Sequence, residues 1–390
     1  MKSMISARFS AFKNAPEKIF SEGYTKLTRY FSEFGFDLKA SDPHLFFILS
    51  GGSELFAIEQ MSEGNFYLLL ASGENNSWAA ATEIKAWMDE HRIDGMLFDL
   101  ENYNDLAKIK NIFTLIEALA GLQGKSIGLI GEPSEWLVAS DVDLKALKAR
   151  FGLSIQKIKW TDVPDYKIFE PDLRFADKYP FHNKQSVGDA SKVKQALQFI
   201  IHKNKFDAIT VECFSLVQEK GVTACLALSD FNDQGTAAGC EGDLTSISGM
   251  MFLKAVTGII PWMANLVKIS NDRVRFAHCT APVNLLEQYR VDTHFETGKG
   301  TAVAGKFSGE IITLFRWNRI LTRAFVAKGK ITEKIQSPDQ ACRTMIEACF
   351  DPEKTSHLKN NPLGNHHLIL PGDHTAQIQL ACRLKGILAE

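Results

Sequence analysis

From His44 onward, short apolar runs alternate with stretches whose apolar positions recur at helical spacing. The first run, Leu45–Ser50, ends in Gly51-Gly52, and later runs of the same kind are 65–70, 95–100 and 126–130. Apolar strands with glycine-rich exits and helical returns are typical of a parallel, doubly wound sheet, which binds ligands at the carboxyl ends of its strands. The forty residues at the start instead have the amphipathic pattern of helices.

The pattern predicts two further regions. A second α/β region runs over 136–265, where a helix over 192–200 leads into a buried-type strand over 206–214. From about Val267 the apolar positions alternate at period two, which indicates a mostly antiparallel β-domain, and a last helix is expected over 376–388. We therefore expect an α/β protein with three domains, at residues 1–135, 136–265 and 266–390.

Composition narrows the class of protein. The 390 residues are 45% hydrophobic and 23% charged, with a formal net charge of -2, as in ordinary globular domains. No basic stripe predicts nucleic-acid binding, and no apolar segment is long enough to span a membrane. The seven cysteines show no C-x-x-C spacing, and the start of the chain lacks a secretory signal, so we expect reduced thiols and a cytoplasmic protein.

Two carboxylates stand where a parallel sheet would bind a ligand. Glu212 ends the buried strand that contains Ala208–Val211, and a buried carboxylate is costly unless it is paired or binds a cation. Glu241 lies between Cys240 and Gly242 before an apolar helix. Each carboxylate also has an explanation that needs no ligand. Glu212 can be solvated at the end of its strand, and Glu241 can cap the helix, although Asp243 is the better placed cap.

Histidines near the ends of predicted C-terminal strands are the other candidates. His278 ends one strand, while His366 and His367 begin another after Asn365. Adjacent residues of a strand point to opposite faces, so only one of His366 and His367 can face a site shared with the carboxylates. Two carboxylates with one or two imidazoles suit Mn²⁺, Co²⁺ or Mg²⁺ better than a structural zinc, although the sequence spacing matches no short metal motif.

Several segments, in this order, resemble the L-fucose isomerase/L-arabinose isomerase superfamily. They are ILSGGSE, LASGENNSWAA, IGLIGEPSEWL, VECFSLV, TACLALSDFNDQG, AGCEGDL, FAHCTAP, THFETG and GNHHLILPGDH. The resemblance runs from about His44 to the end and is strongest over 206–282. It implies two Rossmann-like α/β domains and a C-terminal β-domain, a cytoplasmic isomerase that uses Mn²⁺ or a related cation, and a trimer or hexamer with sites near subunit interfaces.

The resemblance also implies roles for single residues. Glu212 matches the family's first metal ligand and catalytic base, and Glu241 matches the second ligand and proton donor, where fucose isomerases have an aspartate. His366 matches the C-terminal metal ligand, and His278 matches the additional histidine of the arabinose branch. The implied reaction interconverts an aldose, a pentose or a 6-deoxyhexose such as fucose or arabinose, and its ketose through an enediol.

Alternatives remain open for the substrate and for the outer residues of the site. One is isomerisation of a hexose with a sulfonate or phosphate at position 6, for which Arg316, Arg319, Lys299 and Lys306 are possible anion-binding residues. Another is a catalytically silent sugar-binding protein. Candidate substrate contacts are Glu54, Asn76, Ser77, Trp136, Asn365 and His367, of which the first four can equally serve turns or helix caps.

Overall fold

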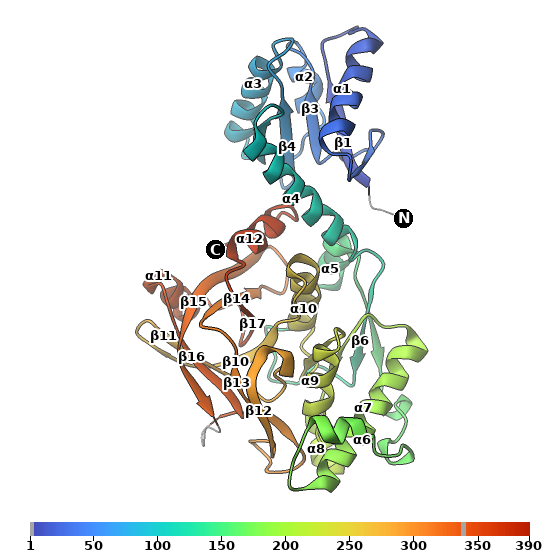
Figure 1. Ribbon diagram of the computed structural model, residues 1–390, viewed down its shortest axis with the longest axis vertical. Coiled ribbons are helices and arrows are strands. Elements are labelled where there is room, and N and C mark those ends of the chain that lie inside the picture. Colours follow the sequence, from blue (N-terminus) through green and yellow to red (C-terminus); the bar gives the residue numbers. More distant parts are fainter. Residues whose placement is uncertain (1–3, 337–340) are drawn as a thin grey trace. The chain divides into compact units, whose positions relative to one another are not determined.

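The computed structural model describes residues 4–336 and 341–390, and these divide into two compact units (Figure 1). The first unit contains residues up to Gly121 together with Leu380–Leu388, and the second contains Leu122–Gln379 with the last two residues. Each unit has its own parallel sheet, and the second also contains an antiparallel barrel. The chain is thus a mixed α/β protein, as the alternation of apolar runs predicts.

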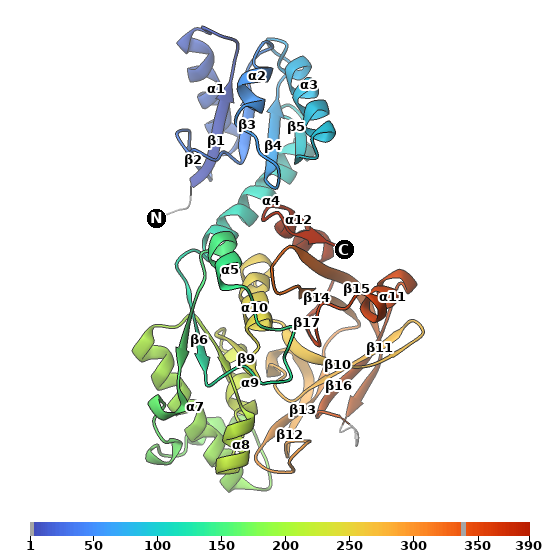
Figure 2. The same ribbon diagram turned by 180° about the vertical axis from the view of Figure 1, so that it is seen from behind.

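The first unit is built on a five-stranded parallel sheet with the order β2-β1-β3-β4-β5, which is the doubly wound order of flavodoxin-like folds. Its strands are β1 (Met4–Ser10), β2 (Gly35–Asp37), β3 (Leu45–Ile48), β4 (Phe66–Ala71) and β5 (Asp94–Asp99). The connecting helices are α1 (Glu17–Tyr30), α2 (Glu54–Ile58), α3 (Ser77–Glu90) and α4 (Tyr103–Ala120), shown in blue to teal in Figures 1 and 2.

One expectation for this unit is wrong. The first forty residues are not all helical, because Met4–Ser10 form β1, which pairs with both β2 and β3. The reason is visible in the strand's burial, since Ile5, Ala7 and Phe9 face the core at period two. The strand predicted at 126–130 is correct, and it pairs with strands Ser154–Ile158 and Ala208–Val211 of the second unit.

The parallel sheet of the second unit has the order β7-β6-β8-β9. Its strands are β6 (Ser126–Ile130), β7 (Ser154–Ile158), β8 (Ala208–Val211) and β9 (Ala237–Cys240). Its α-helices are α5 (Leu144–Phe151), α6 (Leu173–Lys178), α7 (Lys184–Asn204), α8 (Phe214–Lys220), α9 (Cys225–Asp233) and α10 (Leu244–Thr257), and its short 3-10 helices are η1 (Trp160–Asp162) and η2 (Tyr166–Ile168). The residues after β6, β8 and β9 all leave the sheet at its carboxyl edge.

The C-terminal strands form an antiparallel sheet with the order β14-β17-β10-β11-β16-β15, which closes into a barrel because β14 also pairs with β15. These strands are β10 (Trp262–Ser270), β11 (Arg273–His278), β14 (Ile311–Trp317), β15 (Arg323–Gln336), β16 (Thr344–Phe350) and β17 (His366–Pro371). The remaining elements are η3 (Val283–Leu285), the hairpin of β12 (Leu286–Asp292) and β13 (Ala302–Phe307), α11 (Pro352–Asn360), α12 (Thr375–Arg383) and the edge strand β18 (Leu388–Ala389).

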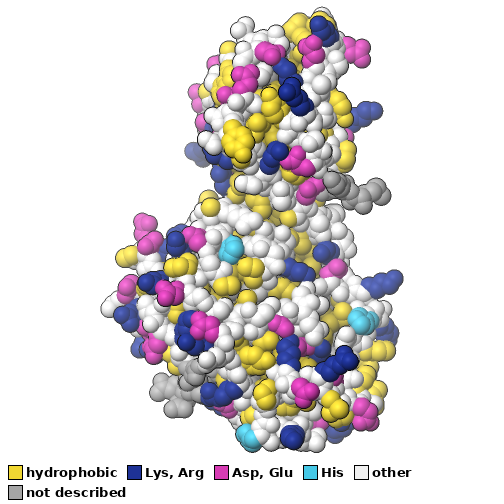
Figure 3. All heavy atoms as spheres, in the orientation of Figure 1, with side chains coloured by type: hydrophobic (Ala, Val, Ile, Leu, Met, Phe, Trp, Pro, Cys, Tyr) yellow, Lys and Arg dark blue, Asp and Glu magenta, His cyan; other side chains and the backbone are white. Residues whose placement is uncertain are grey.

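The core of the second unit combines the barrel with the helices beside it. One cluster of buried side chains includes Trp262, Phe276 and Phe307 of the β-strands together with Leu226 of α9 and Tyr179. On the surface, side chains of both charges are interspersed over the face shown in Figure 3. This mixed surface agrees with the nearly balanced charge of the sequence.

Candidate metal centre

Glu241 lies in a tight connection between β9 and α10. Its backbone has a φ of 61°, and the following Gly242 has a φ of 68°. A Cβ on Gly242 would lie 2.8 Å from the carbonyl oxygen of Glu132, so the close approach of the 132–133 backbone requires glycine. A left-handed backbone conformation is unfavourable for a residue other than glycine. Residues in such conformations occur often at functional sites, where the surrounding structure holds them in place.

Asp243 is the helix cap, as its position predicts. Its side chain accepts hydrogen bonds from the backbone N–H and the hydroxyl of Ser246, at 2.6 and 2.8 Å. Glu241 therefore is not needed to cap α10, and its side chain is directed elsewhere.

Two strands on either side of β10 bring the histidines together. Asn265 of β10 is the register partner of Ala277 in β11 and of His366 in β17. His278 follows Ala277 directly, so it and His366 lie near each other at the same end of the barrel, with ring centroids 5.5 Å apart.

The three side chains converge. Oε1 of Glu241 lies 3.8 Å from Nε2 of His278 and 3.6 Å from Nε2 of His366. One possible ligand atom from each residue lies within 4.8 Å of the other two, and all three residues are buried. Within residues 4–336 and 341–390, neither Nε2 atom has a hydrogen-bond partner. Buried polar atoms normally have partners, so this pair of unpartnered nitrogens beside a carboxylate fits the ligand set of a divalent cation.

Each ligand side chain is held by a further hydrogen bond. Nδ1 of His366 donates to Oδ2 of Asp243 at 2.9 Å, and Nδ1 of His278 lies 3.0 Å from the hydroxyl of Thr280. The Trp136 indole donates to Oε2 of Glu241 at 2.7 Å. A hydrogen bond at Nδ1 fixes the ring so that Nε2 faces the shared space, as the outer partners of metal-bound histidines do.

Burial and neighbouring charges shift the pKa values of Glu241, His366 and Asp243. Burial alone would raise the pKa of Glu241, but the two histidines outweigh it and hold that pKa well below its usual range. Burial alone would lower the pKa of His366, but the carboxylates of Asp243 and Glu241 outweigh it and raise this pKa to about 9. Arg316 and His366 lower the pKa of Asp243 to about 2 against the effect of burial. A proton on His366 thus supplies positive charge between two carboxylates.

Glu212 is not part of this group. Its Oε1 accepts a hydrogen bond from the backbone N–H of Ser215 at 2.9 Å, its Oε2 accepts one from Trp160 Nε1 at 3.3 Å, and the Ser215 hydroxyl also donates to Oε2. The carboxylate therefore lies against the first turn of α8. Val211 and Cys240 are register partners at the ends of β8 and β9. Glu212 and Glu241 are the next residues, so they nonetheless leave adjacent strands side by side.

Aromatic rings adjoin the cluster, and two of them were not predicted. Trp136, which is 54% exposed, packs edge-on against Phe214 at 4.9 Å, and Phe214 packs edge-on against His294 at 5.8 Å. The charges of Glu241 and His278 both act on the His294 ring, whose pKa is lowered chiefly by burial. Phe214 and His294 lie in the VECFSLV and THFETG segments, and their occurrence in these segments was the available sequence signal.

The other candidate residues lie in varied surroundings. His367 points away from the cluster toward Phe276 and Phe325, and burial lowers its pKa to about 3. The Asn365 amide bridges to the side chain of Asn265 at 2.6 Å. His366 is thus the member of the histidine pair that faces Glu241, as expected for alternate faces of one strand.

Three candidates lie in the first unit, at the carboxyl edge of its own sheet. Glu54 begins α2, Asn76 precedes α3 with a φ of 58°, and Ser77 is fully buried with its hydroxyl donating to the carbonyl of Ile48. The hydrogen bond from Ser77 joins the start of α3 to the end of β3 and so stabilises the fold. Contact of Glu54 and Asn76 with a substrate remains a prediction.

Comparison with known proteins gives a partial match. No family model matches the chain. The sulfoquinovose isomerases of Priestia aryabhattai and Priestia megaterium are each 24% identical to it over 184 residues, which are 44% of this chain and 41% of the relative. The matched part is thus less than half the length of these relatives. No helix among residues 4–336 and 341–390 is long and apolar enough to cross a membrane.

Proposed function

We propose that this chain is a divalent-metal-dependent aldose–ketose isomerase. The observation that carries the proposal is the convergence of a Glu241 carboxylate oxygen with two buried, unpartnered imidazole nitrogens, those of His278 and His366. These three side chains would hold the cation, with Mn²⁺, Co²⁺ or Mg²⁺ as the candidates. When bound, the cation would polarise the sugar carbonyl and favour negative charge on O1 and O2.

The residues around the ligands have defined tasks in this proposal. Asp243 keeps the proton of His366 on Nδ1, so that Nε2 presents its lone pair once its own proton has left. Trp136 holds Oε2 of Glu241 and leaves Oε1 toward the histidines. The low pKa of Glu241 suits a residue that stays ionised as a ligand.

Proton transfer is the task we propose for Glu212. Isomerisation moves one proton from C2 to C1 and a second from O2 to O1. A carboxylate within reach of both carbons can take the first proton from C2 and return it to C1, while the second passes between the two neighbouring oxygens. Glu212 leaves β8 beside Glu241, and this task requires its carboxylate to turn from Ser215 toward the cluster by a change of side-chain rotamer. It would then also complete the ligand set with a second carboxylate.

The substrate class has two candidates. The family resemblance favours a pentose or a 6-deoxyhexose. The second candidate is a hexose with a sulfonate or phosphate at position 6, which the match to two sulfoquinovose isomerases favours. Of the cations suggested for that anion, Arg316 is engaged in the structure, since its Nη1 bonds Ser246 and lies 3.4 Å from Asp243.

The test is ketose formation from a panel of pentoses, 6-deoxyhexoses and 6-substituted hexoses with Mn²⁺. We expect one class to be converted by the wild type, while Glu212→Gln and Glu241→Gln lower kcat by more than about 100-fold with an unchanged circular dichroism spectrum. Glu135→Gln, an exposed residue of the Trp136 loop, is the matched control. Sugar binding without turnover, and without stoichiometric metal, would instead identify a silent binding protein.

A further inference from the structure

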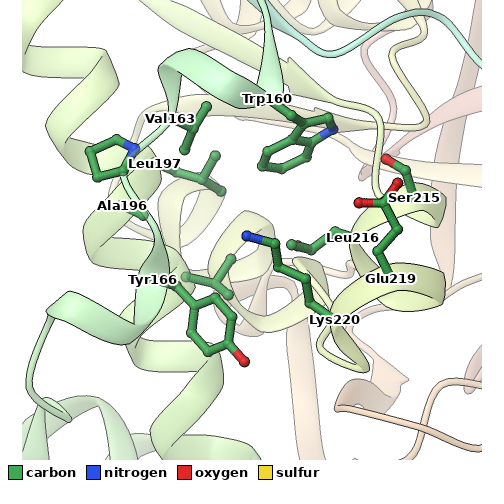
Figure 4. Close-up of a pocket in the computed structure, with 11 residues that line it drawn as sticks. Trp160, Val163, Tyr166, Ala196, Leu197, Ser215, Leu216, Glu219 and Lys220 are labelled. Carbon is green, nitrogen blue, oxygen red and sulfur yellow. The ribbon is translucent and has the colours of Figure 1, made fainter.

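A pocket separate from the three ligand side chains lies at the carboxyl edge of the second parallel sheet, between η1, η2, α7 and α8 (Figure 4). It contains about 450 Å³ of empty space, part of which is open to solvent. Its wall is mainly apolar and includes Val163, Leu197 and Leu216, with the rings of Trp160 and Tyr166 beside them.

The polar groups of the pocket gather at two places. Figure 4 shows Ser215 and the Glu219 carboxylate together near the nitrogen of Trp160. The Lys220 side chain instead extends from α8 across the pocket, with its nitrogen directed toward Leu197 and Tyr166 in Figure 4. A few polar groups that converge on an apolar wall are characteristic of pockets that bind a ligand in one orientation.

The Lys220 ammonium has one weak ion-pair partner among the residues that the structure describes. Its Nζ lies 3.7 Å from Oδ2 of Asp165, and the two side chains are 41% and 50% exposed. An ion pair this exposed contributes little free energy. The free energy of pairing is larger when an anion enters the pocket, because the anion then displaces water from the ammonium group and from the apolar wall beside it.

We propose that this pocket binds a small organic anion with an apolar body, whose carboxylate or sulfonate pairs with Lys220 while its body packs on Leu197, Leu216 and Trp160. None of the lining residues belongs to the Glu241–His278–His366 cluster. The pocket does adjoin the proposed catalytic base, because Trp160 and Ser215 line it and also hold the Glu212 carboxylate. A bound anion therefore contacts the groups that position Glu212.

A pair of probes with the same shape tests the charge requirement. 3-Phenylpropionate carries a carboxylate, and 3-phenylpropionamide carries a neutral amide in its place. We expect calorimetric titration of the EDTA-treated protein to show binding of the acid about tenfold tighter than the amide, as for one charge-assisted contact. In Lys220→Gln this preference should fall to within about twofold, and Lys167→Gln, on the adjacent η2, should keep it because Lys167 does not line the pocket.

A second variant tests the location. Val163 is a partly exposed pocket residue outside the helices, so Val163→Trp should fill the space without disturbing the core and should abolish binding of both probes. Equal affinity for acid and amide, no binding of either at millimolar concentration, or unchanged binding in Val163→Trp would each overturn the proposal. Because the titration uses neither metal nor sugar, its result does not depend on whether the protein is an isomerase.

Discussion

Single residues of the metal cluster show both what sequence can predict and where it stops. Glu241 and Asp243 are two acids at the start of one helix, and position alone identified Asp243 as the cap. The alternation of a strand likewise predicts that only one of His366 and His367 faces the site. The direction of the Glu212 side chain could not be predicted, because it depends on Trp160, which is 52 residues distant in sequence.

The raised pKa of His366 predicts the pH dependence of the metal-free protein. Its pKa rises from the ordinary 6.5 to about 9 in the folded state, so its contribution to stability is complete below pH 6.5 and is lost as the pH rises through about 9. Urea unfolding with EDTA present should therefore show a free energy of unfolding that is lower at pH 9 than at pH 6.5. The expected loss is on the order of a few kcal/mol.

The control for this dependence is His366→Gln, which cannot titrate at this position. Its free energy of unfolding should change less over the same pH interval than that of the wild type. An equal change in both proteins would assign the pH dependence to other groups.

At the scale of elements, the register of β8 and β9 is the feature that relates the two carboxylates. Val211 pairs with Cys240, so the next residue of each strand leaves the sheet at the same edge. The sequence predicted this edge from apolar strands that end on acids. It did not predict that the start of α8 holds Glu212, since that depends on the turn formed at Ser215.

Ser215→Ala tests whether Glu212 moves to the cluster. The variant removes the hydroxyl that donates to Glu212 and keeps the backbone donor. If Glu212 joins the cation, its release becomes easier, and Mn²⁺ should bind about two- to tenfold tighter, the effect of one hydrogen bond. Calorimetric titration should show the opposite change for Glu212→Gln. Wild-type affinity in both variants would place Glu212 outside the ligand set.

At the scale of the whole molecule, the strands were predicted better than their arrangement. Period-two runs identified β11, β13, β14, β15 and β17, but not the closure of the barrel, which requires β14 to pair with both β15 and β17. The unit boundary is also a property of long-range contacts: β6 joins the second sheet, and residues 122–379 form one compact unit. Sequence periodicity is local and contains no information on such pairings.

The cluster joins β9, β11 and β17, which are far apart in sequence, so metal binding should stabilise the second unit. A ligand that binds only the folded state at 100 times its Kd adds about 2.7 kcal/mol to the free energy of unfolding. Mn²⁺ at that concentration should raise the Tm of the EDTA-treated wild type. His278→Ala, which lacks one ligand, should show little or no increase, and an equal increase in this variant would place the bound ion elsewhere.

The most direct test of the central claim is the metal dependence of ketose formation. EDTA-treated protein is incubated with the sugar panel before and after addition of Mn²⁺, with Glu241→Gln treated in parallel. We expect the wild type to convert one class of aldose, and this conversion to be lost with EDTA, restored by Mn²⁺ and absent from the variant. Conversion that survives complete removal of metal, or equal conversion by Glu241→Gln, would contradict it.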